Sequence, residues 1–169
     1  MTTAELLEDA FGRIRELVHR SVDNLSPDRL NLRPGGQANS ITWLIWHLTR
    51  IQDDHIADAA GTGQVWLDGG WAARFGLPLD PADTGYGHDG EAVAAVRVPS
   101  GELLTGYHDA VYEQTTRYVA GLADDELDRI VDKGWDPPVT LGVRLVSVIS
   151  DDLQHVGQAA YVRGLGDLG

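Results

Sequence analysis

The feature that most constrains this chain is helical periodicity, which recurs over four long segments. In the first segment, apolar residues return every three or four positions and form one stripe along a helix. The other three segments show the same spacing, and Ser40 stands as an N-cap before the second. The four segments cover residues 3–25, 41–60, 101–122 and 140–163. Four helices that each bury one face predict an all-α protein with a four-helix bundle.

The connections between these helices differ in length. Around Ser26-Pro27 we expect a single helical turn that ends near Leu30, and an acidic turn over 123–131 with a breaker over 134–138 joins the last two helices. Residues 61–99 are rich in Gly, Asp and Pro, and short helices are expected near 71–75 and 91–98. This crossover is long enough to carry the chain back along the bundle, so helices two and three need not be antiparallel.

Composition excludes several classes of protein. The 169 residues suffice for one domain with a sizeable core, so we expect 1–169 to be a single domain. There is no cysteine, which excludes disulfides, thiolate metal sites and a thiol nucleophile from the protein itself. The net charge of −13 and the lack of a Lys/Arg cluster argue against a nucleic-acid partner. No signal peptide and no membrane-spanning apolar run are visible, so we expect a cytoplasmic protein with no membrane partner.

Polar residues on the buried stripes are the candidates for function. His47 lies inside the apolar stripe of the second helix, and Asp151 and His155 lie one turn apart beside the stripe of the fourth. Such a carboxylate and imidazole can converge on one cation, with His47 as third ligand. Spacing alone leaves Asp152 open as the acidic ligand, and leaves open that His47 is an ordinary hydrogen-bonded core histidine. His55 is eight residues after His47, about 12 Å along the helix, so the two cannot bind one ion.

Two segments resemble the signatures of a known superfamily. Residues 25–48, LSPDRLNLRPGGQANSITWLIWHL, and the C-terminal ISDDLQHVGQAAYVRG, with Gly157-Gln158 after a histidine, resemble the DinB/YfiT-like metalloprotein superfamily. WLIWHL, QDDHIAD, GWAARFGLP and TGYGH are most similar to the subgroup of mycothiol-dependent maleylpyruvate isomerases and mycothiol S-transferases. The resemblance implies a bundle with a crossover between helices two and three, the metal ligands His47 and His155, an acidic second ligand at Asp151, and often a homodimer.

Two functions follow from these residues and the resemblance. In the first, a divalent metal, zinc before nickel or iron, activates a low-molecular-weight, mycothiol-like thiol that attacks an electrophilic substrate. Aromatic residues of the crossover would wall the pocket above the metal, and Arg74 or Arg144 would neutralise a substrate carboxylate; plain packing and surface charge are the alternative for these residues. The candidate binding residues are Trp66, Trp71, Tyr86 and Arg144. In the second function the chain is a non-catalytic metal-binding or ligand-sensing homodimer related to stress.

Overall fold

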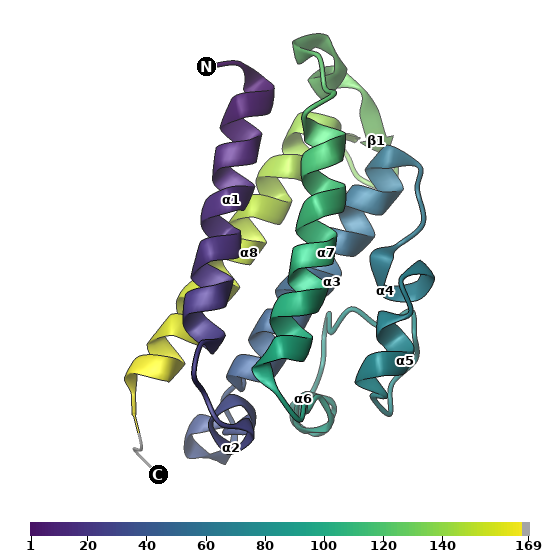
Figure 1. Ribbon diagram of the computed structural model, residues 1–169. Coiled ribbons are helices and arrows are strands. Elements are labelled where there is room, and N and C mark those ends of the chain that lie inside the picture. Colours follow the sequence, from purple (N-terminus) through teal and green to yellow (C-terminus); the bar gives the residue numbers. More distant parts are fainter. Residues whose placement is uncertain (167–169) are drawn as a thin grey trace.

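The computed structural model, which describes residues 1–166, shows an all-α fold built on four long helices (Figure 1). The first and last helices run in one direction, and the two middle helices run in the other. The third of these helices therefore lies parallel to the second, as a long crossover allows. Around the bundle, α3 packs between α7 and α8, and α1 closes the other side against the same two helices. The bounds are α1 Thr3–Val22, α3 Ile41–Ala60, α7 Gly101–Val119 and α8 Leu141–Gly164.

Local chemistry explains where α3 and α8 begin and end. The Ser40 hydroxyl accepts the Trp43 N–H at 3.1 Å, and the Thr140 hydroxyl accepts the Val143 N–H at 3.3 Å, so each helix has a side-chain N-cap. Gly61 ends α3 in the left-handed conformation, at φ 66°, which costs glycine little. These caps fix the register of the two helices that carry the candidate ligands.

The crossover folds into three short helices, α4 Val65–Asp68, α5 Trp71–Phe75 and α6 Gly90–Ala95. The sequence predicts the second and third of them, and α4 is an addition. The carboxylate of Asp53, on α3, accepts the N–H groups of Val65 at 2.8 Å and Trp66 at 2.7 Å, so α4 is capped by a side chain from another helix. Because that cap lies 12 residues away, no local signal announces this helix.

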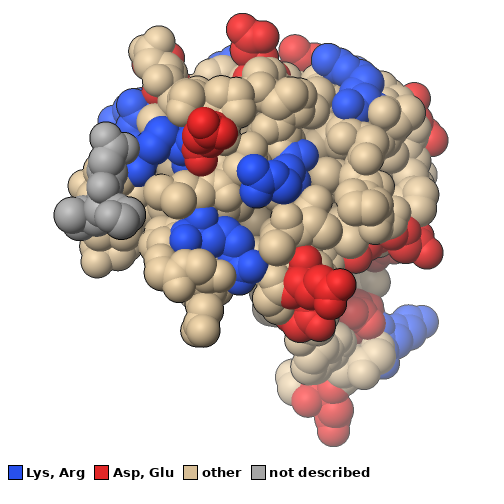
Figure 2. All heavy atoms as spheres, turned by 90° about the horizontal axis from the view of Figure 1, so that it is seen from below, with Lys and Arg blue, Asp and Glu red and all other residues tan. Residues whose placement is uncertain are grey.

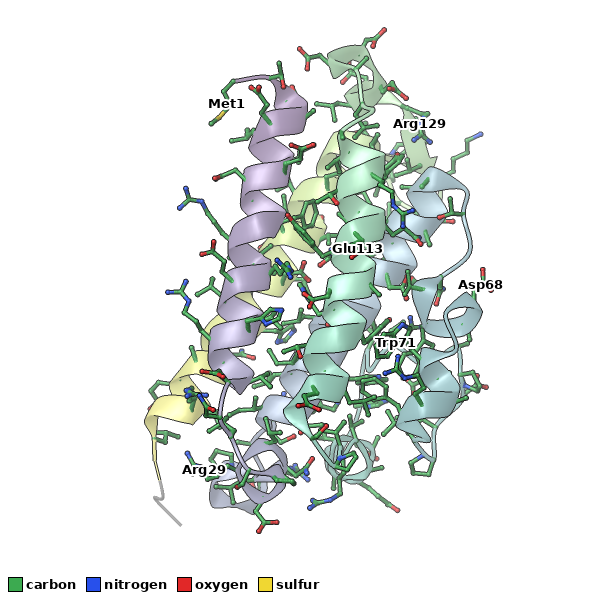
Figure 3. All side chains as sticks on the ribbon, viewed as in Figure 1. Met1, Arg29, Asp68, Trp71, Glu113 and Arg129 are labelled. Carbon is green, nitrogen blue, oxygen red and sulfur yellow. The ribbon has the colours of Figure 1, made fainter. Side chains whose placement is uncertain are left out.

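Two tryptophans attach the crossover to α7. Trp66 and Trp71 are both buried, and their ring centroids lie 5.1 Å and 5.7 Å from the ring centroid of Tyr107. Trp71 lies between α5 and α7 (Figure 3), against Gly106, whose missing side chain leaves room for the indole: a Cβ there would stand 3.0 Å from it. The rings therefore belong to the packed core beneath the crossover.

The remaining elements lie at the two ends of the bundle. Between α7 and α8 the chain forms two short antiparallel strands where the sequence predicts only a turn and a breaker. Strands of two and three residues are too short to show an alternating pattern. These elements are α2 Pro27–Asn31, η1 Pro34–Gly36, η2 Asp124–Asp128, β1 Ile130–Asp132 and β2 Val139–Thr140.

Figure 2 looks onto the end of the bundle where α2 and α6 lie and shows several separate patches of Lys and Arg side chains there. Two arginines, Arg33 and Arg163, hold main-chain segments of the fold together. Arg33 donates to the main-chain carbonyls of Gln37, Ala38 and Gly90 at 2.7–2.8 Å, and so joins α6 to the segment before α3. Arg163 donates to the main-chain carbonyl of Asp23, the C-cap residue that follows α1, at 2.7 Å. Arg163 thus caps the C-terminal end of α1, whereas Arg33 ties two segments of the chain together.

Within residues 1–166, none of the helices is both long enough and apolar enough to cross a membrane.

Candidate metal centre

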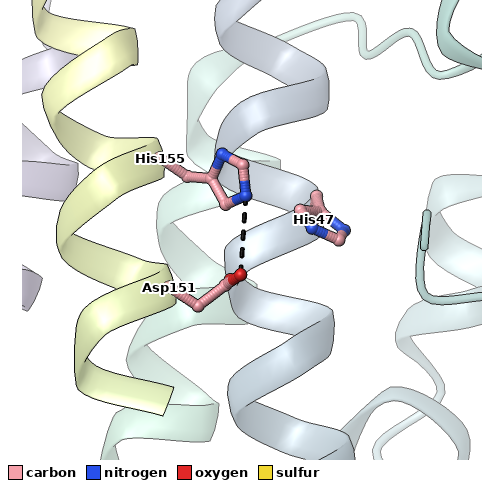
Figure 4. Close-up of side chains that lie close together, drawn as sticks. All are labelled: His47, Asp151 and His155. Carbon is pink, nitrogen blue, oxygen red and sulfur yellow. Dashed lines mark ion pairs between the residues drawn. The ribbon is translucent and has the colours of Figure 1, made fainter. Parts of the chain in front are cut away.

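Three potential ligands meet where α3 faces α8. His47 comes from α3, and Asp151 and His155 come from successive turns of α8 (Figure 4). One ligand atom from each residue lies within 4.8 Å of the others, and Nε2 of His155 is 3.6 Å from Oδ1 of Asp151. Two donors on one tetrahedral ion lie roughly 3–3.5 Å apart at bond lengths of about 2.0–2.2 Å, so small side-chain rotations close the group onto a cation.

His47 is oriented from its far side. Its Nδ1 donates to the main-chain carbonyl of Thr84 at 2.6 Å, which leaves Nε2 as the free lone pair. The ring of Trp43 stacks on the imidazole, with centroids 4.6 Å apart and an interplanar angle of 15°. Burial lowers the pKa of His47, although the bond to Thr84 opposes that effect. The imidazole is therefore neutral at neutral pH, which is the form that binds metal.

His155 is oriented in the same way by Gln158, one turn further along α8. The amide oxygen of Gln158 accepts a hydrogen bond from Nδ1 of His155 at 2.9 Å, so Nε2 again turns toward the partner helix. Burial lowers the pKa of His155, but the nearby Asp151 carboxylate and the hydrogen bond to Gln158 outweigh it, and the pKa stands above its ordinary value. A cation at this position therefore competes with a proton for Nε2.

The two aspartates of α8 have different surroundings. Oδ2 of Asp151 is buried and has no hydrogen-bond partner among the described residues, and the same carboxylate belongs to the group with His47 and His155. Such an orphaned carboxylate oxygen beside two imidazole nitrogens is the arrangement expected of a divalent-cation site. Asp152 is fully buried on the interior side of α8, where burial, and next the neighbouring Asp151, raise its pKa well above the ordinary value. The geometry thus groups Asp151 with the histidines.

The crossover is held against the metal centre by buried polar contacts. Arg50, one turn after His47 and fully buried, donates from Nε to the carbonyl of Asp83 at 3.1 Å, next to the carbonyl that receives His47. The carboxylate of Asp83 accepts the Gly85 N–H at 2.7 Å and contacts Nε2 of His88 at 2.9 Å. Residues 83–88, which include the TGYGH motif, therefore support the far side of the His47 ring.

The crossover passes so close to the His47 ring that position 85 requires a glycine. Its φ is +87°, and a Cβ on it would stand 2.8 Å from Nδ1 of His47 and 2.9 Å from the ring of Trp46. A side chain at this position would push the crossover away from the imidazole.

A groove of about 910 Å³ opens next to the segment 83–88 of the crossover. Tyr86 and Arg144, two of the predicted binding residues, line it together with His55 and Trp135. Thr84 also lines it, so the groove begins at the residue whose carbonyl orients His47. We call this cavity the Tyr86–Trp135 groove.

The other predicted binding residues lie elsewhere. Trp66 and Trp71 are buried in the core under the crossover and are not among the described residues that line the groove. The guanidinium of Arg74 lies over the ring of Trp71, 3.7 Å from its centroid.

Arg144, which does line the groove, is already engaged, because its Nη2 donates to Asp132 at 2.9 Å and its Nη1 contacts His55 at 3.0 Å.

Sequence reasoning gave no role to several residues that shape the centre. Gln158 and Trp43 stand three and four positions from a candidate ligand on the same helix, so helical spacing could have identified both. The carbonyl of Thr84 could not be found in this way, because it is a main-chain group 37 residues from His47.

The fold and the three converging side chains are those of the DinB/YfiT-like class of four-helix-bundle proteins. Within that class the family model described as mycothiol-S-transferase matches residues 6–167, and the chain belongs to this family. A similar solved structure is titled as the crystal structure of the conserved protein of locus from Enterococcus faecalis. It is 33% identical, with a TM-score of 0.91, over 98% of this chain and 97% of that one. No curated protein matches the chain.

Proposed function

We propose that this protein is a divalent-metal-dependent thiol S-transferase that uses a low-molecular-weight thiol such as mycothiol. The observation that carries the proposal is the centre itself. It consists of His47, Asp151 and His155, with both imidazoles tied at Nδ1 and one carboxylate oxygen buried without a partner among the described residues. Membership of the mycothiol-S-transferase family supports the identity of the thiol.

Three protein ligands leave room for a further ligand, as catalytic zinc sites do. Zinc is our first choice, with nickel or iron as alternatives, because two imidazoles and one carboxylate suit all three ions. His47, Asp151 and His155 would hold the divalent ion, which would lower the pKa of a bound thiol and so would supply a thiolate at neutral pH.

The chain has no cysteine, so the sulfur must come from a cosubstrate. With a Michael acceptor, the thiol gives up its proton to solvent and its sulfur forms the new S–C bond. The π pair of the acceptor moves to the carbon next to its carbonyl group, and a proton from water completes the thioether. The contribution of His47, Asp151 and His155 is to fix where the sulfur lies while Trp43 and the crossover keep the His47 ring in place.

The test combines metal loading with product analysis. Metal-free protein is reloaded with zinc, nickel or iron, mixed with mycothiol and a maleimide, and the thioether is quantified by mass spectrometry. We expect formation above the protein-free rate with at least one metal and none above it without metal. The matched control is His108→Leu, which removes a buried histidine of α7 outside the centre.

Absence of metal-dependent product with mycothiol or bacillithiol would refute the proposal. If metal removal then only lowers the thermal midpoint, the non-catalytic metal-binding alternative is correct. Failure of the purified protein to retain any metal would reduce the centre to a set of core side chains.

A further inference from the structure

The Tyr86–Trp135 groove has a composition that the proposed function does not explain. Residues of α3 and α8 show where the groove lies relative to the candidate metal centre. Ile51, one turn after His47 on α3, lines the groove, as does Arg144, seven residues before Asp151 on α8. Seven residues are about 10 Å along a helix and nearly two full turns, so Arg144 and Asp151 face the same side. A ligand in the groove therefore lies on the face of α3 and α8 that carries the candidate metal centre, one to two helical turns from it.

Two aromatic rings mark the rim of the groove. Tyr86 comes from the crossover and Trp135 from the loop between the two strands. They are 89% and 68% exposed, which is unusual for large rings in a chain whose other aromatics mostly pack inside. Exposed rings from two separate loops that line one cavity offer faces on which a planar ligand stacks.

The lining of the groove is acidic. Asp54, Asp58 and Asp132 line it, and among residues 1–166 the one Arg or Lys that does so is Arg144. That guanidinium is paired with Asp132 at 2.9 Å. Burial, followed by the nearby Arg144 charge, lowers the pKa of His55, so this imidazole is neutral at neutral pH. The groove thus offers carboxylates without an unpaired cation.

From this charge pattern we infer that the groove binds the electrophile, and that it takes a planar, uncharged or cationic one and rejects an anionic one. The inference rests on the proposed thiol transfer and names its substrate class. A carboxylate substrate would face Asp54 and Asp58 with no free guanidinium to receive it, because Arg144 is occupied. An uncharged ring meets the faces of Tyr86 and Trp135 at no electrostatic cost, and a cation gains from both the rings and the carboxylates.

The experiment uses two electrophiles that differ only in charge, N-phenylmaleimide and its para-carboxy derivative. Each metal-dependent rate with mycothiol is divided by the uncatalysed rate, which removes intrinsic reactivity. We expect about tenfold preference for the neutral imide at low ionic strength, from two nearby like charges in a partly screened groove, and a smaller preference in high salt. Equal normalised rates would overturn the inference and leave the thiol transfer standing.

Charge-reversal variants locate the cause. Asp58→Lys, at an exposed groove position, should reduce the preference about threefold or more. Glu16→Lys makes the same change in net charge on the exposed face of α1 and should leave the preference as it is in the wild type. An equal response of the two variants would show that total charge, and not the groove, decides.

A binding measurement separates the inference from the reaction. N-phenylsuccinimide and its para-carboxy derivative cannot be conjugated, and their binding can be followed by saturation-transfer NMR on zinc-loaded protein. Tighter binding of the neutral imide, weakened by Trp135→Ala, supports the groove assignment even if no conjugation is found. Equal binding of the two imides, or no change in Trp135→Ala, overturns it.

Discussion

Two seams of the bundle carry buried histidines, and they differ in what surrounds the rings. At the α3–α8 seam, His47 meets a carboxylate and a second imidazole from the facing helix. At the α1–α7 seam, His108 is fully buried, and neither of its ring nitrogens has a partner among the described residues. The neighbouring Asp109 turns outward and binds Arg15 at 2.7 Å.

The difference is one of register. Asp151 and His155 are four residues apart and share one face of α8, whereas Asp109 is adjacent to His108 and points about 100° away from it around α7. A buried histidine becomes a candidate ligand only when donors on the facing helix converge on the same point.

The largest effect is expected from removal of a ligand at the α3–α8 seam. His47→Ala or His155→Ala should abolish metal retention, because two remaining ligands cannot hold the ion against dialysis. Metal content is measured by elemental analysis after a chelator wash. The same measurement should show undiminished metal in His108→Leu, and full metal content in His47→Ala would disprove the ligand assignment.

The next effect concerns the orientation of His155. Gln158→Ala removes the acceptor at Nδ1 while keeping all three ligands, and we expect metal affinity to fall about 10–100-fold. Competition with a fluorescent chelator measures this fall. Gln158→Glu keeps an acceptor at the same place and should restore most of the affinity, whereas equal losses in the two variants would mean that the hydrogen bond does not orient the ring.

A third prediction sets the pH response of the α1–α7 seam. Burial lowers the pKa of His108 from 6.5 to about 4. Between these values the unfolded chain binds a proton that the folded chain does not, so the free energy of unfolding falls as the pH falls from 6.5 to 4. From pH 7 to pH 5 the loss from this one group is about 2 kcal/mol.

Denaturant titrations of metal-free wild type and His108→Leu at both pH values isolate this contribution. The variant should lose about 2 kcal/mol less than the wild type over the same interval, since every other group titrates in both proteins. Parallel losses would show that His108 is not held neutral by burial.

The smallest effect is expected at the outer side of the α1–α7 seam. Asp109 is about one-third exposed and pairs with both Arg15 and His19, at 2.7 and 2.8 Å. Asp109→Asn should cost less than about 1 kcal/mol of unfolding free energy, and the cost should shrink in high salt. A larger, salt-independent loss would show that the pair stabilises the seam more than an exposed ion pair does.

Much of the fold follows from local pattern. The apolar stripes predict the four long helices within a few residues, and the caps at Ser40 and Gly61 fix α3. The parts that escaped prediction depend on distant partners: α4 begins where Asp53 caps it, and the two strands exist only as a pair. Single-sequence patterns do not record contacts between segments far apart in the chain.

The candidate site divides in the same way. Helical spacing and the family resemblance place His47, Asp151 and His155 together, and the structure brings ligand atoms of all three within 4.8 Å. Sequence patterns cannot assign a role to Trp66 and Trp71, because an aromatic residue in a long crossover can either line a pocket or pack in the core. In the structure both indole rings pack against the ring of Tyr107, and tertiary packing sets the position of Tyr107 against the crossover.

Thr84 contacts both the candidate metal centre and the groove. Its carbonyl accepts a hydrogen bond from His47, and the residue lines the Tyr86–Trp135 groove. A ligand that shifts or steadies this residue changes the free energy of the imidazole behind it. The four states, with and without ligand and with and without ion, form a closed thermodynamic cycle. The factor by which the ligand strengthens ion binding therefore equals the factor by which the ion strengthens ligand binding. For the proposed ion and the proposed groove ligand, this one main-chain carbonyl would couple the two binding free energies.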